Sequence, residues 1–209
     1  MTDPIKDLQK QTFRYYYEDG LVEMAVGILF AVIGINTWLI SVLPKGTPLS
    51  IAAWVLLPLL TIGGIIGVQR FVKNLKEQLV YPRTGFIDYS ATPNPYRWVV
   101  MGTALLLTVV IFFAPYSFLN RESVAGGTIL FIILVSIGAQ VDLRRLIVIG
   151  VLSLGLGIGL AFLPGSEHAG LSLTYAGSGL ALIATGALAW RSYLANNPLP
   201  VEGSGGNNA

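Results

Sequence analysis

Ionisable side chains are scarce in this sequence, and they lie at the edges of its apolar runs. Charged residues make up 11% of the chain, whereas soluble chains carry about 25%. Glu23 lies at the start of the first apolar run, where the positive end of a helix dipole favours a carboxylate. We expect this dipole-and-cap role for Glu23, and an ion-coupling site is the alternative.

Two amides are the other polar groups that could do chemistry near the apolar runs. Asn36 lies deep in the first run, and Gln69 ends the second run. A buried amide in a membrane usually donates a hydrogen bond to a neighbouring helix. We expect Asn36 to join two helices in this way. The alternative is a site for a small solute formed by Glu23, Asn36 and Gln69.

Several classes of site are excluded by the residues that are missing. The chain has no cysteine, which removes disulfides, thiolate nucleophiles and cysteine metal sites. It has one histidine, His168, so it cannot build a multi-histidine metal site alone. No apolar run has an ionisable residue at its centre, as proton relays and pumps require. We therefore assign no catalytic, cofactor-binding or metal-ligating residue, and the sequence leaves the identity of any cofactor unknown. His168 is expected to be solvated.

Six uncharged windows are long enough to cross a membrane as helices, because a span needs about 20 mostly apolar residues. In lipid the backbone must satisfy its own hydrogen bonds, so each window should be helical. The sequence thus predicts an all-α integral membrane bundle. The windows are Met24–Pro44, Gly46–Gln69, Trp98–Asn120, Ser123–Val141, Leu146–Ser166 and His168–Trp190.

The distribution of basic residues predicts the orientation of these spans. Six crossings put the N-terminus, residues 71–95, the Asp142–Arg145 turn and the C-terminus on one side. That side holds all but two of the 13 lysines and arginines, the exceptions being Lys45 and Arg121. Loops rich in lysine and arginine remain in the cytoplasm. The predicted location is the cytoplasmic membrane, with both termini inside.

The regions outside the spans divide into three parts. Residues 1–20 are predicted to form a cytoplasmic amphipathic segment, with no cleaved signal peptide. Residues 21–194 form the membrane domain, which includes a cytoplasmic loop at 71–95. Residues 195–209 are polar and rich in glycine and asparagine, so a disordered tail is expected.

The loop at 71–95 has the longest polar stretch between the apolar runs. A helical turn over Asn74–Val80, continuing the second span, is an alternative for its start. The loop's β-prone residues flank Pro82-Arg83-Thr84-Gly85, which is turn chemistry and favours a small hairpin. Arg83 and Asp88 are expected to pair with each other or with lipid headgroups. A catalytic or ligand-binding role for these two residues is the alternative.

Two short motifs carry a family resemblance. One is the Tyr-Pro-Arg-x-Gly core that begins at Tyr81, and the other is the Tyr-Tyr-Tyr-Glu-Asp-Gly-Leu-Val-Glu run that begins at Tyr15. Over about thirty residues the chain resembles small, uncharacterised prokaryotic polytopic membrane proteins with such an inner loop. The resemblance implies a multi-pass membrane protein and no particular activity.

Glycines in the predicted spans indicate where helices approach closely. The fifth and sixth windows are rich in glycine, and we expect them to form a tightly packed pair. In the second window Gly63, Gly64 and Gly67 predict another close contact.

Three hypotheses for function follow. The first is a non-catalytic membrane protein, a small subunit or scaffold that binds a membrane-protein partner or a second copy of itself. Its contacts to a partner or to headgroups would be Tyr15, Tyr16, Tyr17, Tyr81, Arg83, Asp88 and Arg97.

The second hypothesis is a transporter or channel for a neutral solute. The third is an interfacial lipid-modifying enzyme, with Glu23, Arg83 and Asp88 close together. Lipid is the expected surrounding in all three, and the small net charge of +2 argues against nucleic acid.

Overall fold

The computed structural model of the chain describes residues 17–80, 121–162 and 167–198, and these residues form helices and turns without a strand. Five of the helices are long and apolar enough to cross a membrane. The prediction of an all-helical fold is confirmed for these residues, and the five helices are compatible with a multi-pass membrane protein. The helices are α2 (Leu21–Val42), α3 (Pro48–Leu75), α6 (Arg121–Val141), α7 (Arg144–Ala161) and α8 (Glu167–Asn196). The predicted third span, 98–120, lies outside the described residues.

The first two helices begin at recognisable caps. Before α2, Gly20 adopts a φ of 76°, and the Asp19 carboxylate accepts a hydrogen bond from the Leu21 N–H. Before α3, the Thr47 hydroxyl accepts from the Ser50 N–H, and Pro48 occupies the first helical position. Both arrangements satisfy backbone donors that a helix start leaves without partners.

The second span is longer than its uncharged window. The sequence predicts a loop from Phe71, but α3 continues to Leu75, and Lys76–Val80 form a π-helical turn, η1. No proline or glycine occurs between Arg70 and Val80 to end the helix. Val72 and Lys76 are buried. The chain is therefore still helical at Phe71, where the loop was expected to begin, and the helical alternative for Asn74–Val80 is confirmed.

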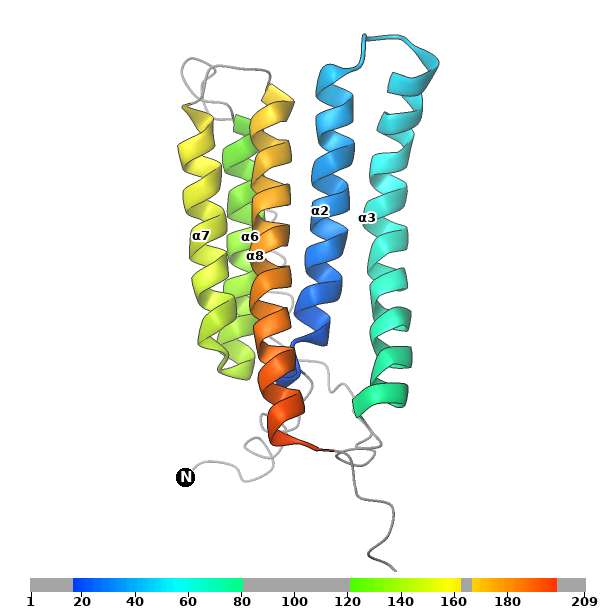
Figure 1. The fold of residues 1–209 in the computed structure, drawn as a ribbon. Helices are drawn as coiled ribbons and strands as arrows, with labels where there is room; N and C mark the ends of the chain where they lie inside the picture. The colour runs from blue at the N-terminus through cyan, green and yellow to red at the C-terminus, as the bar shows by residue number, and fades with distance from the viewer. Residues whose placement is uncertain (1–16, 81–120, 163–166, 199–209) are drawn as a thin grey trace, which may run out of the picture.

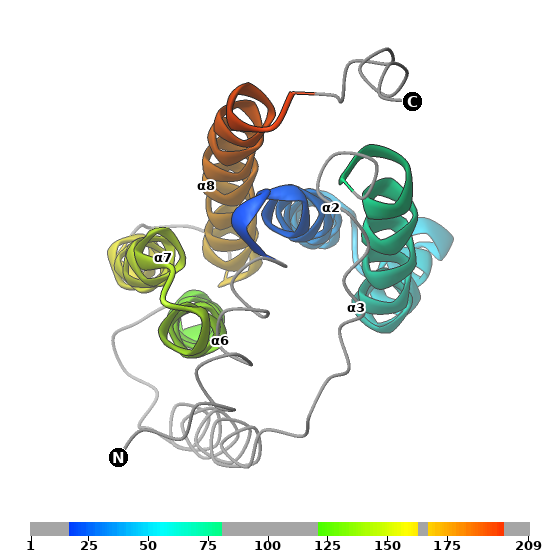
Figure 2. The same cartoon turned by 90° about the horizontal axis from the view of Figure 1, so that it is seen from below.

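The five helices lie side by side with their axes roughly parallel (Figure 1). Seen along the helices, α2 lies between α8 and α3, while α6 and α7 form a hairpin beside α8 (Figure 2). The most extensive contacts are between α2 and α8 and between α6 and α7. The start of α2, η1 and the start of α7 share one end of the bundle, which we call the basic end. The starts of α3, α6 and α8 meet at the opposite end.

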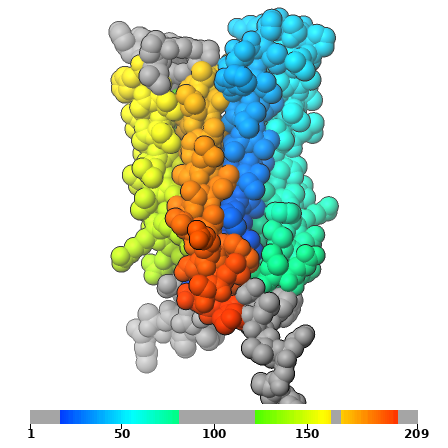
Figure 3. All heavy atoms as spheres, viewed as in Figure 1, coloured from blue at the N-terminus to red at the C-terminus, as the bar shows by residue number. Residues whose placement is uncertain are grey.

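Small residues allow α2 and α8 to touch along their length (Figure 3). A Cβ atom on Gly27 would lie 2.7 Å from the Gly179 carbonyl oxygen, and one on Gly186 would lie 2.7 Å from that of Gly20. At Gly34 the Ser172 hydroxyl donates to the backbone carbonyl over 2.8 Å. These contacts bring the two backbones together, as in other packed membrane helices.

The expected pairing of the fifth and sixth spans was wrong in its main partners. Both α7 glycines that have a neighbour, Gly150 and Gly157, face α6: a Cβ on Gly157 would lie 2.6 Å from the Ser123 carbonyl oxygen. The α8 glycines Gly179 and Gly186 face α2 instead. The direct contact between α7 and α8 is smaller. Glycine content showed that these helices pack closely, but not which helices they pack against.

Helix α3 contributes least to the interior of the described bundle. Most of its apolar side chains are exposed, including Leu59 and Ile62. Gly64 contacts Leu29 of α2, whereas Gly63 and Gly67 meet no atom of the described residues within 4 Å of a built Cβ. The predicted close contact is therefore found at Gly64. Exposed apolar side chains suit a helix that faces lipid.

Candidate functional site

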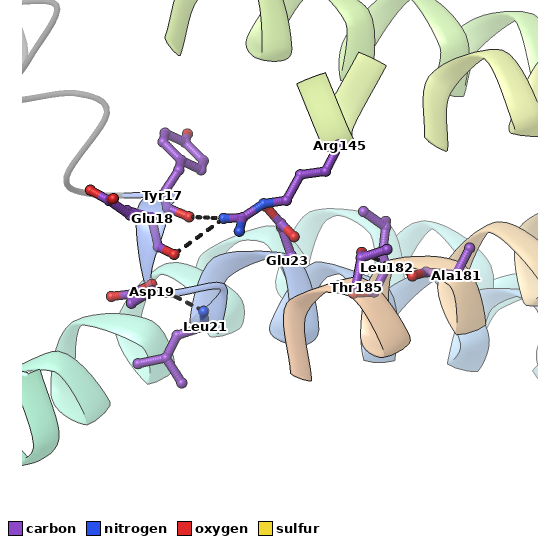
Figure 4. A network of polar contacts seen from close by, with 9 residues as sticks. All are labelled: Tyr17, Glu18, Asp19, Leu21, Glu23, Arg145, Ala181, Leu182 and Thr185. Atoms are coloured by element: carbon purple, nitrogen blue, oxygen red, sulfur yellow. Dashed lines mark hydrogen bonds and ion pairs between the residues drawn. The ribbon is translucent and has the colours of Figure 1, made fainter. Parts of the chain in front are cut away.

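Charged residues from three elements meet at the basic end of the bundle. Arg145, in the first turn of α7, donates from Nε to Glu23 Oε1 over 2.7 Å. It also donates from Nη2 to the carbonyl oxygens of Tyr17, at 2.6 Å, and Glu18, at 3.3 Å. Figure 4 shows the guanidinium pointing at the start of α2. One side chain thus fixes the start of α7 against the chain segment that enters the first span.

A second ion pair joins η1 to the same segment. Lys76 Nζ lies 2.6 Å from Asp19 Oδ2, and the two side chains are 2% and 1% exposed. A helical turn beyond α3 is needed to bring Lys76 to this position. The pair therefore anchors the end of α3 to the residue that caps α2.

The charges of these four side chains sum to zero. Asp19 and Glu23 carry two negative charges, and Lys76 and Arg145 carry two positive charges. Burial raises the pKa of the Asp19 carboxyl, and the Lys76 ammonium offsets part of this rise. Burial also raises the pKa of the Tyr17 hydroxyl. The Glu23 Oε2 oxygen is buried and has no hydrogen-bond partner among the described residues. Desolvation is the largest cause of the raised pKa of Asp19.

The arrangement suits bracing better than catalysis. Each buried carboxylate faces a cation from a different helix, so no free base or nucleophile stands among these four residues. Within residues 17–80, 121–162 and 167–198 no three acidic or histidine side chains are placed to hold a metal ion. The pairs can hold the start of α2, η1 and the start of α7 together. Separating either pair would leave a buried charge uncompensated, and this costs free energy.

The three polar residues predicted in the first two spans do not form one site. Glu23 lies in the first turn of α2, as expected, and is 2% exposed in its pair with Arg145. Asn36 is buried and donates to the Ala53 carbonyl oxygen of α3 over 3.1 Å, a bond between helices. Gln69 is exposed on α3. The structure therefore places these three side chains in separate surroundings.

Of the predicted inner surface, one residue is described. Tyr17 is partly buried and packs against the apolar cluster of Leu134, Val141, Leu143, Leu146, Ile149 and Leu182. The other six residues lie outside the described part of the chain: Tyr15, Tyr16, Tyr81, Arg83, Asp88 and Arg97. The enzyme hypothesis stays a prediction for Arg83 and Asp88, while its third member, Glu23, is already paired with Arg145.

Sequence reasoning missed Asp19, Lys76 and Arg145 as members of the site. Arg145 counted toward the basic side, and Lys76 fell in the predicted loop. One signal was available: Asp19 and Glu23 are four residues apart at the entrance to an apolar run. Two carboxylates so close to lipid need cations nearby. The nearest candidates in space could not be identified from sequence separation.

No family model, curated protein or solved structure matches this chain. The resemblance carried by the Tyr15 and Tyr81 motifs therefore stays a prediction. Function has to be inferred from the residues and their geometry.

Proposed function

We propose that the chain is a non-catalytic polytopic protein of a cytoplasmic membrane and serves as a small subunit or scaffold of a membrane complex. The observation that carries this proposal is the pairing of both buried carboxylates at the basic end, Glu23 with Arg145 and Asp19 with Lys76. Side chains used in this way stabilise an assembly and leave no reactive group among the four. The glycine contacts between α2 and α8 support the same conclusion, because they favour a closely packed pair over a mobile one.

We propose six spans in total, with both termini in the cytoplasm. The end of α3 and the start of α6 lie at opposite ends of the bundle, which supports one further crossing between them. The charge distribution supports the orientation. The basic end carries Lys73, Lys76, Arg144 and Arg145, whereas the opposite end carries Lys45 and the start of α6 at Arg121.

The partner would bind at the basic end, on the surface predicted from the tyrosines and charged residues of the inner loops. Tyr17 lies beside the carbonyl groups that Arg145 holds, so the bracing pairs fix the backbone next to this surface. A preformed backbone reduces the entropy that binding must overcome. The partner is a membrane protein or a second copy of the chain.

Extraction from native membranes in a mild detergent tests this proposal. Native mass spectrometry should find a complex of fixed stoichiometry that is heavier than one 22.4 kDa chain. Tyr16→Ala should weaken the complex, and Lys45→Ala, at the opposite end, should leave it intact. A monodisperse single chain would contradict the proposal.

A carrier for a small neutral solute is the second candidate, because one buried amide has an oxygen that could still accept a hydrogen bond. The Asn36 Oδ1 oxygen is buried and lacks a hydrogen-bond partner among the described residues. Flux into liposomes containing the purified protein would test this. Asn36→Leu should abolish the flux, and flux that is unchanged in this variant would rule out Asn36 as the site.

A further inference from the structure

A pocket opens at the end of the bundle opposite the ion pairs. It has a volume of about 740 Å³ and lies between the end of α2, the turn into α3, the first turns of α3 and the start of α8. Pockets for small molecules measure roughly 300–1,000 Å³. Its lining residues are Ile40, Ser41, Leu43, Lys45, Gly46, Ser50, Ile51, Trp54 and His168.

Lys45, Ser50 and His168 reach this pocket from three different elements. Lys45 stands in the turn and is exposed; it forms no ion pair or hydrogen bond with the rest of residues 17–80, 121–162 and 167–198. Ser50 is 4% exposed at the start of α3, and its hydroxyl has no bond to the described residues. His168 comes from α8. Lys45 and Ser50 can donate hydrogen bonds.

His168 is held in place rather than solvated, contrary to the sequence-based expectation. Its Nδ1 lies 2.7 Å from Glu122 Oε2, and its ring meets Trp54 edge to face, with the centroids 5.6 Å apart. Its side chain is 28% exposed. Glu122 occupies one ring nitrogen, so Nε2 is the nitrogen that can serve a ligand. Whether Nε2 donates or accepts depends on the tautomer of the ring.

The remaining wall is mostly apolar, and its one further hydroxyl, that of Ser41, donates to the Trp38 carbonyl oxygen. Ile40, Leu43, Ile51 and Trp54 line the pocket beside Lys45, Ser50 and His168. A ligand that matches both parts needs an anionic head and a short apolar body. A phosphate fits the head better than a carboxylate, because its tetrahedral oxygens can meet donors that converge from separate elements. Lysine is a common partner for phosphate as a point charge.

We propose that this pocket binds the phosphate group of a small amphiphile, with Lys45 and Ser50 as its donors, His168 Nε2 as a further polar contact and Trp54 against its apolar chain. The phosphate is that of a lipid headgroup or of a soluble phosphate ester. The site lies at the end of the bundle away from the ion pairs, so it does not depend on the proposed scaffold function.

Calorimetric titration of the full chain in a neutral detergent tests the site, with hexyl phosphate as the probe. Hexyl phosphate should bind, and hexanol should bind at least about tenfold more weakly because it lacks the charge. Lys45→Gln should weaken binding by about tenfold or more, since a charge-assisted hydrogen bond is lost. His168→Gln provides a second, independent variant in the event that Lys45→Gln is poorly folded.

Lys73→Gln is the matched control, because Lys73 is an exposed lysine of α3 at the opposite end of the helix from the pocket. It should bind hexyl phosphate as the wild type does. Equal binding of hexanol and hexyl phosphate would overturn the proposal. So would equal weakening by Lys45→Gln and Lys73→Gln, or no binding at all.

The source of the phosphate is distinguished in nanodiscs. Two discs are compared, one of a phosphate-free galactolipid and one of the same lipid with added phosphatidylglycerol. If hexyl phosphate binds more weakly in the disc with phosphatidylglycerol, the natural occupant is a lipid headgroup. If hexyl phosphate binds equally well in both discs, the natural occupant is a soluble phosphate ester. Both results support the site.

Discussion

Arg145 and Glu23 are 122 residues apart in the chain and are joined by a 2.7 Å hydrogen bond at the basic end of the bundle. The bond connects the start of α7 to the start of α2, two helices that are not neighbours in sequence. Glu23 is 2% exposed, whereas Arg145 keeps 26% of its side chain exposed. Arg145 lies at the edge of the bundle, and its positive charge compensates the buried negative charge of Glu23. Without this compensation, burial of the carboxylate would cost free energy.

Arg145→Met should destabilise the protein by about 3 kcal/mol, in the lower part of the range for breaking buried ion pairs because Arg145 is partly exposed. The loss leaves Glu23 without its cation and the Tyr17 and Glu18 carbonyls without their donor. Thermal unfolding in detergent measures the effect. Arg144→Met is the control, since Arg144 is the preceding residue and its side chain is exposed. Equal melting temperatures for the two variants would contradict the bracing role.

Asp19 and Lys76 should show strong coupling in a double-mutant cycle. Asp19→Asn keeps the Oδ1 acceptor of the Leu21 N–H and removes only the carboxylate charge that faces Lys76. Asp19→Asn or Lys76→Met alone should cost about 3–5 kcal/mol, because one charge of the buried pair loses its counter-charge. The double variant removes both charges from an apolar site, so it should recover most of that loss. Burial already raises the pKa of Asp19, which indicates that the site penalises charge. The free energy of unfolding in detergent is measured for the wild type, the two single variants and the double variant.

The cycle has a matched pair in Lys73 and Glu77, whose charged atoms lie 3.9 Å apart on the exposed side of the same helix. Exposed pairs of this kind contribute about 0.3–0.5 kcal/mol. Coupling between Asp19 and Lys76 no larger than this would show that the buried pair does not anchor η1.

Glycine substitutions should change stability in opposite directions at two sites. A Cβ on Gly27 would lie 2.7 Å from a backbone oxygen of α8, so Gly27→Ala should cost about 1–3 kcal/mol through overpacking. Gly63 has no described atom within 4 Å of a built Cβ. Gly63→Ala should therefore be neutral or stabilise the helix by up to about 1 kcal/mol. Melting temperatures in detergent should fall for the first variant alone. Equal losses would show that α3 is packed at Gly63 as tightly as α2 is at Gly27.

Helix formation was predictable because lipid leaves a spanning backbone no other way to satisfy its hydrogen bonds. Helix ends were less predictable. Arg70 and Lys73 ended the uncharged window, but long basic side chains can extend from a helix toward water, so charge alone does not end the helix. The helical continuation over Asn74–Val80 was an alternative at the start of the loop, and the structure confirms it as the end of α3 and the π-helical turn Lys76–Val80.

Helix partners were harder to predict, because apolar spans lack a polar face that would show which side is buried. One unused signal was periodic: Gly20, Gly27 and Gly34 recur every seven residues, as do Ser172, Gly179 and Gly186. These two series face one another in the structure. The ion pairs carried no such signal, since their members come from distant segments, and a pairing between segments cannot be derived from one sequence.

The orientation of the basic end is the central claim, and the chain allows a direct measurement because it has no cysteine of its own. Lys45→Cys and Arg144→Cys place single thiols at exposed positions on opposite ends of the bundle. In right-side-out membrane vesicles, a membrane-impermeant maleimide should label Lys45→Cys at once and Arg144→Cys after the membrane is permeabilised. Labelling of Arg144→Cys in sealed vesicles, with Lys45→Cys protected, would contradict the account.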